Sequence, residues 1–369
     1  MLRRIFSLIL KEARMIWRDK KSRMVLIVPP ILQTIIFSFA VTLDVKNVSI
    51  AVLNQDSGRE GYELVERFRG SGTFTHVLYL QGVQEIQPTI DSQKSLLVLH
   101  IPSDFSRQVE DGASGQVQLI LDARRTNAAQ ICLGYANRIV STFNQEIETQ
   151  RNIPHQRAAL VTRTWFNPNK TFPWFSLPSL VAVLTAIEAL LLTGLSVARE
   201  RELGTFDQLL VSPLQPFEIL VGKSVPPMIA GIGEGTFIIT VAVFVFGVPF
   251  QGSLALLYGA MCVYLLAVVG VGLFISSLVA TQQQALLGVF MCMIPLVQLS
   301  GFATPVENMP DWLQVLNHAN PMAYFMTISK GIFLKDMSVG AVMSNTWPMA
   351  IIACVTLTAA AWLFRKRLA

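Results

Sequence analysis

The stretch that decides the fold is residues 235–306, which read GTFIITVAVFVFGVPFQGSLALLYGAMCVYLLAVVGVGLFISSLVATQQQALLGVFMCMIPLVQLSGFATPV. These 72 residues contain no Asp, Glu, Lys or Arg. A membrane-spanning helix needs about 20 predominantly apolar residues, and no soluble core requires an uncharged stretch of this length. The sequence therefore predicts a polytopic α-helical membrane protein.

The composition of the whole chain agrees with this prediction. Of its 369 residues, 52% are hydrophobic and 14% are charged, whereas about 25% of the residues of a typical soluble domain are charged. The mean hydropathy is +0.49. These values exclude a disordered chain and argue against an ordinary soluble enzyme.

The basic residues gather beside the apolar segments. Residues 1–23 carry eight basic and two acidic side chains, whereas residues 44–173 carry thirteen of each. An excess of Lys and Arg next to membrane spans marks the cytoplasmic side. We therefore interpret the excess of basic residues as a signal of membrane orientation. We expect no nucleic-acid partner.

Six apolar segments are long enough to span a membrane. They lie at residues 24–43, 174–198, 225–246, 253–280, 285–302 and 341–364. Six spans would place both termini on the same side of the membrane. The basic residues at both ends predict that this side faces the cytoplasm. Residues 1–23 precede the first span as an amphipathic helix that we expect to lie on the lipid headgroups.

Residues 44–173 form the one large polar region, between the first and second spans. Short apolar runs alternate there with helical patterns, which predicts a compact α/β domain on the outer side of the membrane. Cys132 is its only cysteine, so the domain cannot form an internal disulfide. Residues 174–369 carry the remaining five spans.

No motif for catalysis or metal binding is visible. Gly222-Lys223-Ser224 resembles the end of a phosphate-binding loop, but Phe217 stands where the first glycine belongs, and Pro226 follows. We interpret Lys223 instead as a lysine that snorkels from the boundary of a span. The four histidines have no metal-ligand spacing, so we expect no reaction, cofactor or metal in this chain.

The segment at residues 199–223 is the informative cytoplasmic loop, and it begins RERELGTFDQLLVSPL. Its charges end a span abruptly, Gly204 permits a sharp turn, and apolar residues then share one helical face until Pro213. Such a short helix along the membrane is either a docking element for a partner or an ordinary interfacial loop.

This segment resembles the coupling-helix signature of type-2 ABC exporter permeases. The matching residues are Arg199, Glu200, Glu202, Gly204, Thr205, Leu209, Leu210, Val211, Pro213 and Leu214. The resemblance extends over the whole chain, and it is greatest to multidrug permeases of the enterobacterial inner membrane that carry a large periplasmic domain.

The resemblance implies a six-helix type-2 ABC exporter fold with an α/β periplasmic domain inserted between its first two spans. It implies two permease chains, alike or paired with a close paralogue, and a separate ABC ATPase that binds ATP and Mg. That ATPase would dock on the coupling segment and the N-terminal helix, and amphiphilic drug-like or lipid-like substrates would leave outward. Membrane lipid and a periplasmic adaptor are further candidate partners.

Two carboxylates lie within predicted spans, Glu188 in the second and Glu234 in the third. An intramembrane charge costs a few kcal/mol, so it usually faces a cavity or a partner. A site for a cation, a proton or a cationic substrate is one interpretation, and a structural hydrogen bond between helices is the other. Glu234 lies within Gly231–Gly235, a G-x-x-x-G stretch that permits close helix contact.

The loop at residues 304–340 carries apolar and aromatic side chains outside the predicted spans. It is expected either to re-enter the outer edge of the membrane or to pack as a surface loop. Residues around it resemble the outer gate of the same family: Ser300, Gly301, Pro305, Pro310 and Pro321.

Two other functions remain open from the sequence. An ion-coupled secondary transporter would use Glu188 and Glu234, but no inverted repeat supports it. A non-transporting receptor or scaffold would need fewer spans and no coupling signature. The expected function is therefore that of an exporter permease without enzymatic activity of its own.

Overall fold

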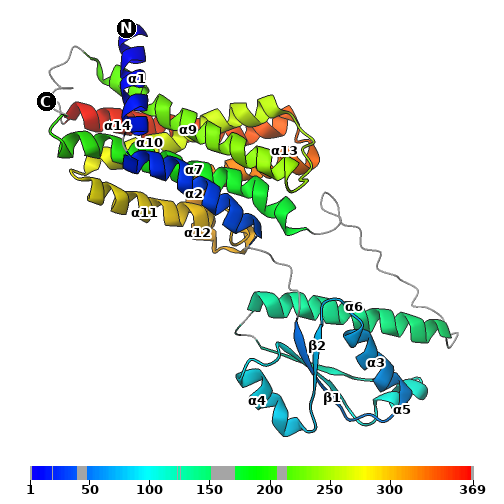
Figure 1. Ribbon diagram of the computed structural model, residues 1–369. Helices are drawn as coiled ribbons and strands as arrows, with labels where there is room; N and C mark the ends of the chain where they lie inside the picture. Colours follow the sequence, from blue (N-terminus) through cyan, green and yellow to red (C-terminus); the bar gives the residue numbers. More distant parts are fainter. Residues whose placement is uncertain are drawn as a thin grey trace. The chain divides into compact units, whose positions relative to one another are not determined.

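The computed structural model describes residues 2–18, 20–39, 48–122, 124, 126–150, 171–205 and 214–366. The chain divides into two compact units (Figure 1). One is formed by Met1–Val41 together with Thr164–Ala369, and the other by Thr42–Arg163. The second unit is thus inserted into the sequence of the first.

The first unit is helical. Its longer helices are α1 (Leu2–Arg18), α2 (Lys20–Phe39), α7 (Phe172–Glu202), α9 (Pro216–Phe244), α10 (Leu254–Leu278), α11 (Gln282–Leu299), α13 (Pro321–Lys335) and α14 (Val339–Lys366). Five of them, α7, α9, α10, α11 and α14, are long and apolar enough to cross a membrane. The apolar part of α2 is shorter, at Leu26–Phe37, so the described residues contain five such helices where the sequence predicts six.

Helix α7 lies at the centre of this unit and packs against α2, α9, α10, α11 and α13. Tyr264 of α10 stacks on Phe325 of α13 with ring centroids 4.5 Å apart, and its hydroxyl donates to the carbonyl oxygen of Ala182 in α7 at 2.7 Å. A buried tyrosine needs such a partner for its hydroxyl group. The contact fixes three helices against one another.

The G-x-x-x-G stretch packs α9 against α10. A β-carbon on Gly231 would lie 3.0 Å from Leu265, and one on Gly235 would lie 2.8 Å from the sulfur of Met261. Larger residues at these positions would therefore push the two helices apart. The predicted close helix contact is present, and its partner is α10.

The boundaries of the 199–223 segment differ from the expectation. Helix α7 continues to Glu202, and α9 already begins at Pro216, so Pro226 and Pro227 lie inside α9. Proline is favoured in the first turn of a helix, and Glu218 accepts from the backbone N–H of Gln215 in a capping box. These two signals start the helix earlier than hydropathy indicates.

The second unit is an α/β domain built on a four-stranded sheet. Its strands are β1 (Ser49–Asn54), β2 (His76–Tyr79), β3 (Leu97–Ile101) and β4 (Gln118–Leu121), in the order β2-β1-β3-β4. β1 is parallel to β2 and β3, whereas β3 and β4 are antiparallel. The helices are α3 (Arg59–Arg69), α4 (Ile86–Asp91), α5 (Phe105–Glu110) and α6 (Thr126–Gln150).

Alternate side chains of the central strands face two different layers. Ile50 and Val52 belong to the core that includes α3, α5 and α6, whereas Ala51 and Leu53 belong to the smaller core with α4. This alternation follows from the two-residue period of a strand. Helices on both faces account for the continuous apolar runs in β1 and β3.

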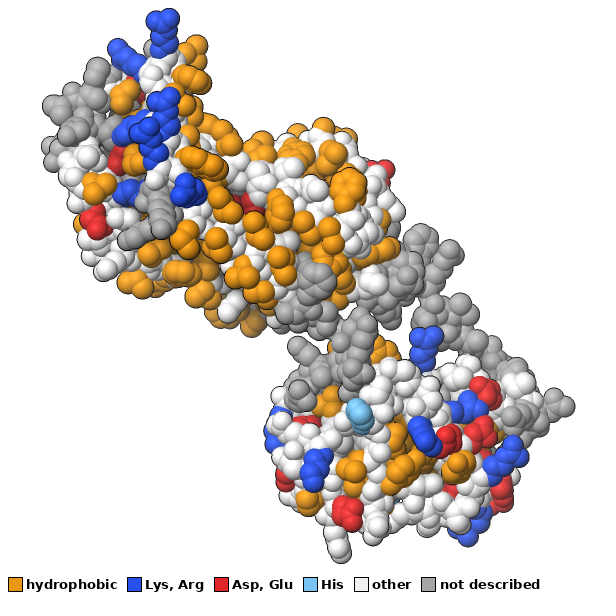
Figure 2. Space-filling model, viewed as in Figure 1, with side chains coloured by type: hydrophobic (Ala, Val, Ile, Leu, Met, Phe, Trp, Pro, Cys, Tyr) orange, Lys and Arg blue, Asp and Glu red, His pale blue; other side chains and the backbone are white. Residues whose placement is uncertain are grey.

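The surfaces of the two units differ in composition. Figure 2 shows apolar side chains along the flank of the helical bundle and basic side chains over α1, whereas the α/β unit carries acidic and basic side chains intermixed. An apolar flank is what a lipid-facing surface requires. The contrast agrees with the sequence-based division into membrane and non-membrane parts.

Candidate functional site

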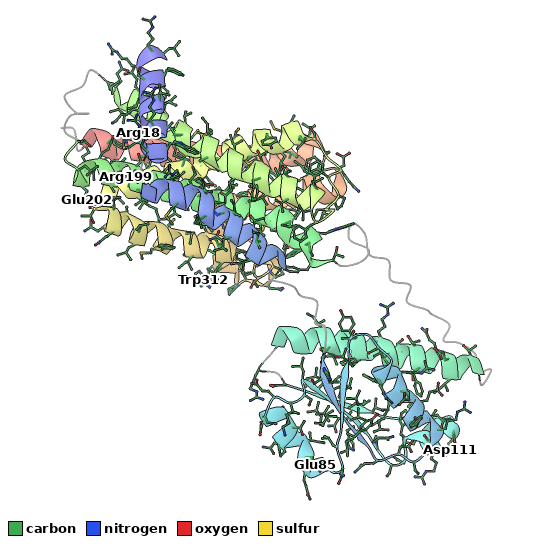
Figure 3. The ribbon with its side chains drawn as sticks, in the orientation of Figure 1. Arg18, Glu85, Asp111, Arg199, Glu202 and Trp312 are labelled. Carbon is green, nitrogen blue, oxygen red and sulfur yellow. The ribbon has the colours of Figure 1, made fainter. Side chains whose placement is uncertain are left out.

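The signature residues stand in the last turns of α7 and differ in burial. Glu200 is buried, Arg199 and Arg201 are half-buried, and Glu202 is exposed. Figure 3 labels Arg199 and Glu202 at the end of the bundle beside α1. The four consecutive charges therefore do not form one solvated surface.

Lys223 of α9 is the centre of a buried charge cluster at this end. Its Nζ atom lies 2.7 Å from Glu200 Oε2 and 2.9 Å from Glu12 Oε1, and it donates to Ser196 Oγ at 3.1 Å. The lysine side chain is 0% exposed. All three of its protons therefore have partners, which a buried ammonium requires.

The N-terminal helix contributes a second cation. Lys11 of α1 donates to Glu200 Oε1 at 2.8 Å, while Ser196 Oγ donates to Glu12 Oε2 at 3.3 Å. Two carboxylates and two ammonium groups thus balance one another across α1, α7 and α9. This charge cluster is defined by Lys11, Glu12, Glu200 and Lys223.

Small residues let α1 approach α9 closely. Leu8 of α1 is buried against Ile219 of α9, and a β-carbon on Gly222 would lie 2.3 Å from Leu8 Cδ2. Since Gly222 precedes Lys223, the glycine admits the helix that carries the partner Glu12. The Gly-Lys-Ser sequence is therefore a helix-packing element.

The other signature residues connect α7 to α10 and α11. Arg201 donates to the carbonyl oxygens of Ser277 at 3.0 Å and Val279 at 2.7 Å. Glu202 Oε2 accepts from the backbone and the side-chain amide of Gln282 at 2.9 and 3.2 Å. The end of α7 is thus held by the turn that joins α10 to α11.

The chain turns sharply after Glu202. Gly204 has φ +69°, a conformation that favours glycine, and the backbone N–H of Thr205 donates to the carbonyl oxygen of Glu200 at 3.0 Å. Leu209, Leu210 and Pro213 lie outside the described residues. Of the predicted coupling residues, the structure thus brings together Arg199, Glu200, Glu202, Gly204 and Thr205.

A cavity of about 380 Å³ lies beside the charge cluster. It is lined by Glu12, Met15, Ile16, Leu192, Leu195, Ser196, Arg199, Glu202, Lys223, Pro227, Gln282, Gln283 and Leu286. These residues come from α1, α7, α9 and α11. The cavity therefore shares two signature residues, Arg199 and Glu202, with the predicted coupling site.

The two carboxylates of the predicted spans are both buried. Glu188 lies in α7 and Glu234 in the adjacent helix α9, and among the described residues both Oε atoms of Glu188 and Oε2 of Glu234 have no hydrogen-bond partner. Among the residues that the structure describes, no Lys or Arg forms an ion pair with either of them. Their role, functional or structural, remains a prediction.

The predicted outer-gate residues occupy turns and helix ends. Ser300 ends α11, Gly301 has φ +84°, Pro305 and Pro310 precede the 3₁₀ turn Val306–Asn308 and α12 (Asp311–Asn317), and Pro321 opens α13. Glycine favours a positive φ, and proline suits a position at or just before the first turn of a helix. Figure 3 labels Trp312 on α12, where it is 65% exposed.

Helix α13 is buried in the helical unit. Phe325 and Phe333 are fully buried, and Ser329 Oγ donates to the carbonyl oxygen of Pro178 in α7 at 2.7 Å. Asn320 caps α13 and also donates to the carbonyl oxygen of Leu296 in α11 at 2.9 Å. This part of the 304–340 loop thus packs on the bundle.

Two findings at the charge cluster correct or extend the sequence interpretation. Lys223 does not snorkel; it is fully buried because Glu12 and Glu200 neutralise it. Glu12 and Ser196 were not predicted as site residues. The available signal was a lone acidic residue within the basic N-terminal helix, matched by a lone lysine at the start of an apolar segment.

Comparisons with known proteins identify the family of the chain. Residues 20–362 match the family described as ABC-2 family transporter protein. The chain is 46% identical over 367 residues to the probable multidrug ABC transporter permease YbhR of Escherichia coli (strain K12), with all of both chains covered. It is 29% identical over 371 residues to the probable multidrug ABC transporter permease YbhS of the same organism, covering 99% of this chain and 97% of that one.

A eukaryotic relative is also similar. ABC transporter G family member 20 of Dictyostelium discoideum is 26% identical over 344 residues, which cover 88% of this chain and 46% of that protein. The resemblance to ABC exporter permeases is thereby confirmed. The chain is a multi-pass permease subunit and belongs to the ABC-2 transporter family.

Proposed function

We propose that this permease subunit exports amphiphilic substrates, drug-like or lipid-like, from the cytoplasm or the inner leaflet. A separate ABC ATPase subunit binds ATP and Mg and hydrolyses the nucleotide. The observation that carries this proposal is the anchoring of the signature segment. The end of α7 is fixed to α1 and α9 by ion pairs of the buried Glu200 with Lys11 and Lys223, and to α11 by hydrogen bonds of Glu202, so a force applied there would reach several helices at once.

The proposed topology has six spans, with α2 as the first. Exposed apolar side chains form a two-residue-wide stripe along α2: Met24, Ile27, Val28, Ile31, Leu32, Ile35 and Ile36. A stripe of this kind suits lipid or a neighbouring helix. With both termini cytoplasmic, the α/β unit (within residues 44–173) lies on the periplasmic side of the inner membrane.

Within the coupling segment we assign two kinds of role. Glu202 and Gly204 are exposed and lie where an ATPase would dock. Glu200 is 1% exposed, so it acts by holding α1 to α7 through Lys11 and Lys223. Movement of the docked segment would then shift the N-terminal helix together with the bundle.

The proposed second permease chain, identical or a close paralogue, packs against α11. Leu287, Phe290, Met291 and Ile294 are exposed on that helix, and their spacing of three or four residues places them on one face.

The 304–340 loop is proposed to re-enter the outer edge of the membrane. A periplasmic adaptor remains a candidate partner of the α/β unit, and Glu188 with Glu234 remains a candidate polar site.

The proposal is tested with inverted membrane vesicles that contain the chain and its ATPase. We expect uptake of a lipophilic fluorescent dye that requires ATP and persists when the proton gradient is collapsed by an uncoupler. Uptake driven by a proton gradient without ATP would contradict the proposal and return attention to Glu188.

A further inference from the structure

Strand β2 forms an exposed edge of the sheet in the α/β unit. It pairs with β1 on one side, and among the described strands none lies on its other side. Leu78 and Tyr79 of β2 are 41% and 57% exposed. Residues 70–84 contain no Asp, Glu, Lys, Arg or Pro, although charges and prolines commonly keep an edge strand from pairing with another chain. The strand therefore has the properties of a pairing surface.

The opposite edge of the sheet, at β4, is different. Helix α6 packs against β4, and the apolar side chains of that strand are half-buried. Asp122, directly after β4, forms an ion pair with Arg124 at 2.9 Å. Charged residues thus follow β4 immediately but do not follow β2, so exposed apolar side chains distinguish one edge of this sheet from the other.

The backbone of β2 shows which of its residues are available for pairing. The N–H of Leu80, just after the strand, donates to the carbonyl oxygen of Val52 in β1 at 2.9 Å. Backbone groups of successive residues in a strand point to opposite sides. Leu78 therefore points its N–H and C=O groups towards β1, whereas Val77 and Tyr79 point theirs to the free edge. This edge offers two donors and two acceptors.

We propose that β2 pairs in the antiparallel direction with β2 of a second copy of this chain. With Leu78 opposite Leu78 of the second copy, Val77 of each chain lies opposite Tyr79 of the other. Val77 and Tyr79 then exchange both of their backbone hydrogen bonds, and the two-fold axis makes four such bonds in total. Leu78 forms the non-hydrogen-bonded pair at the axis, where opposite side chains lie closest.

The side chains of this pairing also match. Apolar cross-strand pairs stabilise a sheet, and pairs of an aromatic with a β-branched residue are among them. Val77 would meet the ring of Tyr79, and the two copies of Leu78 would meet each other. Leu78 lines a groove of about 410 Å³ together with Pro88 and Thr89 of α4, so the groove can accept Leu78 of the second copy.

The inference rests on the proposed second permease chain, and it specifies that this chain is identical. Two short strands would hold free domains together only marginally. Two helical units that pack side by side raise the effective concentration of their α/β units, which makes a weak pairing sufficient.

Disulfide cross-linking in native membranes tests the pairing and its register. The four native cysteines are replaced by alanine, and Leu78→Cys is introduced. Non-hydrogen-bonded pairs have Cα atoms about 4.5 Å apart, which a disulfide can bridge. Tyr79→Cys is the matched control, because two copies of residue 79 lie one residue from the axis in opposite directions, beyond the roughly 7 Å limit of a disulfide. Tyr62→Cys on α3, 65% exposed, reports random collision.

We expect at least about fivefold more covalent dimer from Leu78→Cys than from either control after mild oxidation. Val77→Cys and Tyr79→Cys chains that carry different tags should cross-link when they are produced together, because these residues lie opposite each other. Val77→Pro added to Leu78→Cys should abolish the cross-link, since it removes a donor at the free edge and keeps the pairing with β1. The melting temperature and ATPase retention confirm that each variant is folded.

Equal cross-linking of Leu78→Cys and both controls would overturn the proposal. So would a folded Leu78→Cys chain that forms no dimer, or one that cross-links only to a paralogous permease. If the ATPase and a second permease chain are retained without this cross-link, the inference fails and the proposed function stands. Specific cross-linking at residue 78 without ATP-dependent dye uptake would support the inference and refute the proposed function.

Discussion

Lys223 illustrates how a single residue organises the cytoplasmic end of the bundle. It is buried between carboxylates that lie 211 positions before it and 23 positions before it in the sequence. Removing one partner of a buried ion pair is far more costly than removing an exposed one, because the remaining charge stays desolvated. The two lysines of the cluster offer a direct comparison of these cases.

Lys223→Met should destabilise the chain by about 3–5 kcal/mol, since it leaves Glu12 and Glu200 without their buried cation. Lys11→Met should cost no more than about 1 kcal/mol, because the Lys11 side chain is 47% exposed. Denaturant or thermal unfolding of the detergent-solubilised chain measures both. Similar losses in the two variants would contradict the role assigned to burial.

Glu202 tests the link between the signature and transport. Glu202→Ala removes the acceptor that holds Gln282 at the start of α11. We expect export to fall about tenfold while the ATPase still assembles and hydrolyses ATP. Gln282→Ala is the control, because the backbone N–H at residue 282 can still donate to Glu202, so a smaller loss is expected. Normal export by Glu202→Ala would remove this residue from the coupling pathway.

At the scale of an element, α1 is held by its contact with α9. Gly222→Ala would place a β-carbon 2.3 Å from Leu8 Cδ2 and push α1 away, at a cost of about 1–3 kcal/mol. Gly233→Ala on the same helix has nothing within 4 Å of the new methyl group and should be neutral or stabilising by up to about 1 kcal/mol. Proteolysis of the N-terminal segment would report the release of α1, and equal protection in both variants would count against close packing.

In the α/β unit, an ion pair joins α3 to α6. Arg67 bonds to Glu146 and Glu63, and this guanidinium lowers the pKa of Glu146. A carboxylate with a lowered pKa in the folded state stabilises the fold above its unfolded pKa, near 4. That contribution should be lost as the pH falls through the lowered value.

Hydrogen exchange of α6 as a function of pH measures this contribution. Protection should be constant near neutral pH and should decrease in acid, and Glu146→Gln should show a flatter dependence. Identical profiles for wild type and variant would show that the Arg67–Glu146 pair does not tether α6.

At the scale of the whole molecule, the sequence predicted the elements better than the contacts between them. Hydropathy predicted the five long apolar helices, and the alternation of short apolar runs with helical patterns predicted an α/β unit, because each is a local property of the sequence. The start of α9 was missed because Glu218 and Lys223 interrupt the apolar run of residues 216–223, whereas Pro216 and the capping box start the helix there. For α2 the sequence overestimates the apolar length: the predicted span covers residues 24–43, whereas the apolar part of the helix is Leu26–Phe37.

The candidate site was predictable only where its residues are adjacent. Arg199 to Thr205 were identified because they form one motif. Their link to Lys11 was not, because a pairing between residues 189 positions apart leaves no periodic signal. A buried lysine and an exposed one also look the same in a sequence, so the neutralisation of Lys223 could be seen only once α1, α7 and α9 were assembled.

The measurement that tests the central claim most directly is the composition of the native complex. The tagged chain is extracted from its own membrane in mild detergent, and the proteins that remain bound are identified and quantified by mass spectrometry. The account predicts a stoichiometric ABC ATPase subunit together with a second permease chain, identical or paralogous. A chain recovered alone, yet still moving substrate in proton-loaded vesicles without ATP, would contradict it.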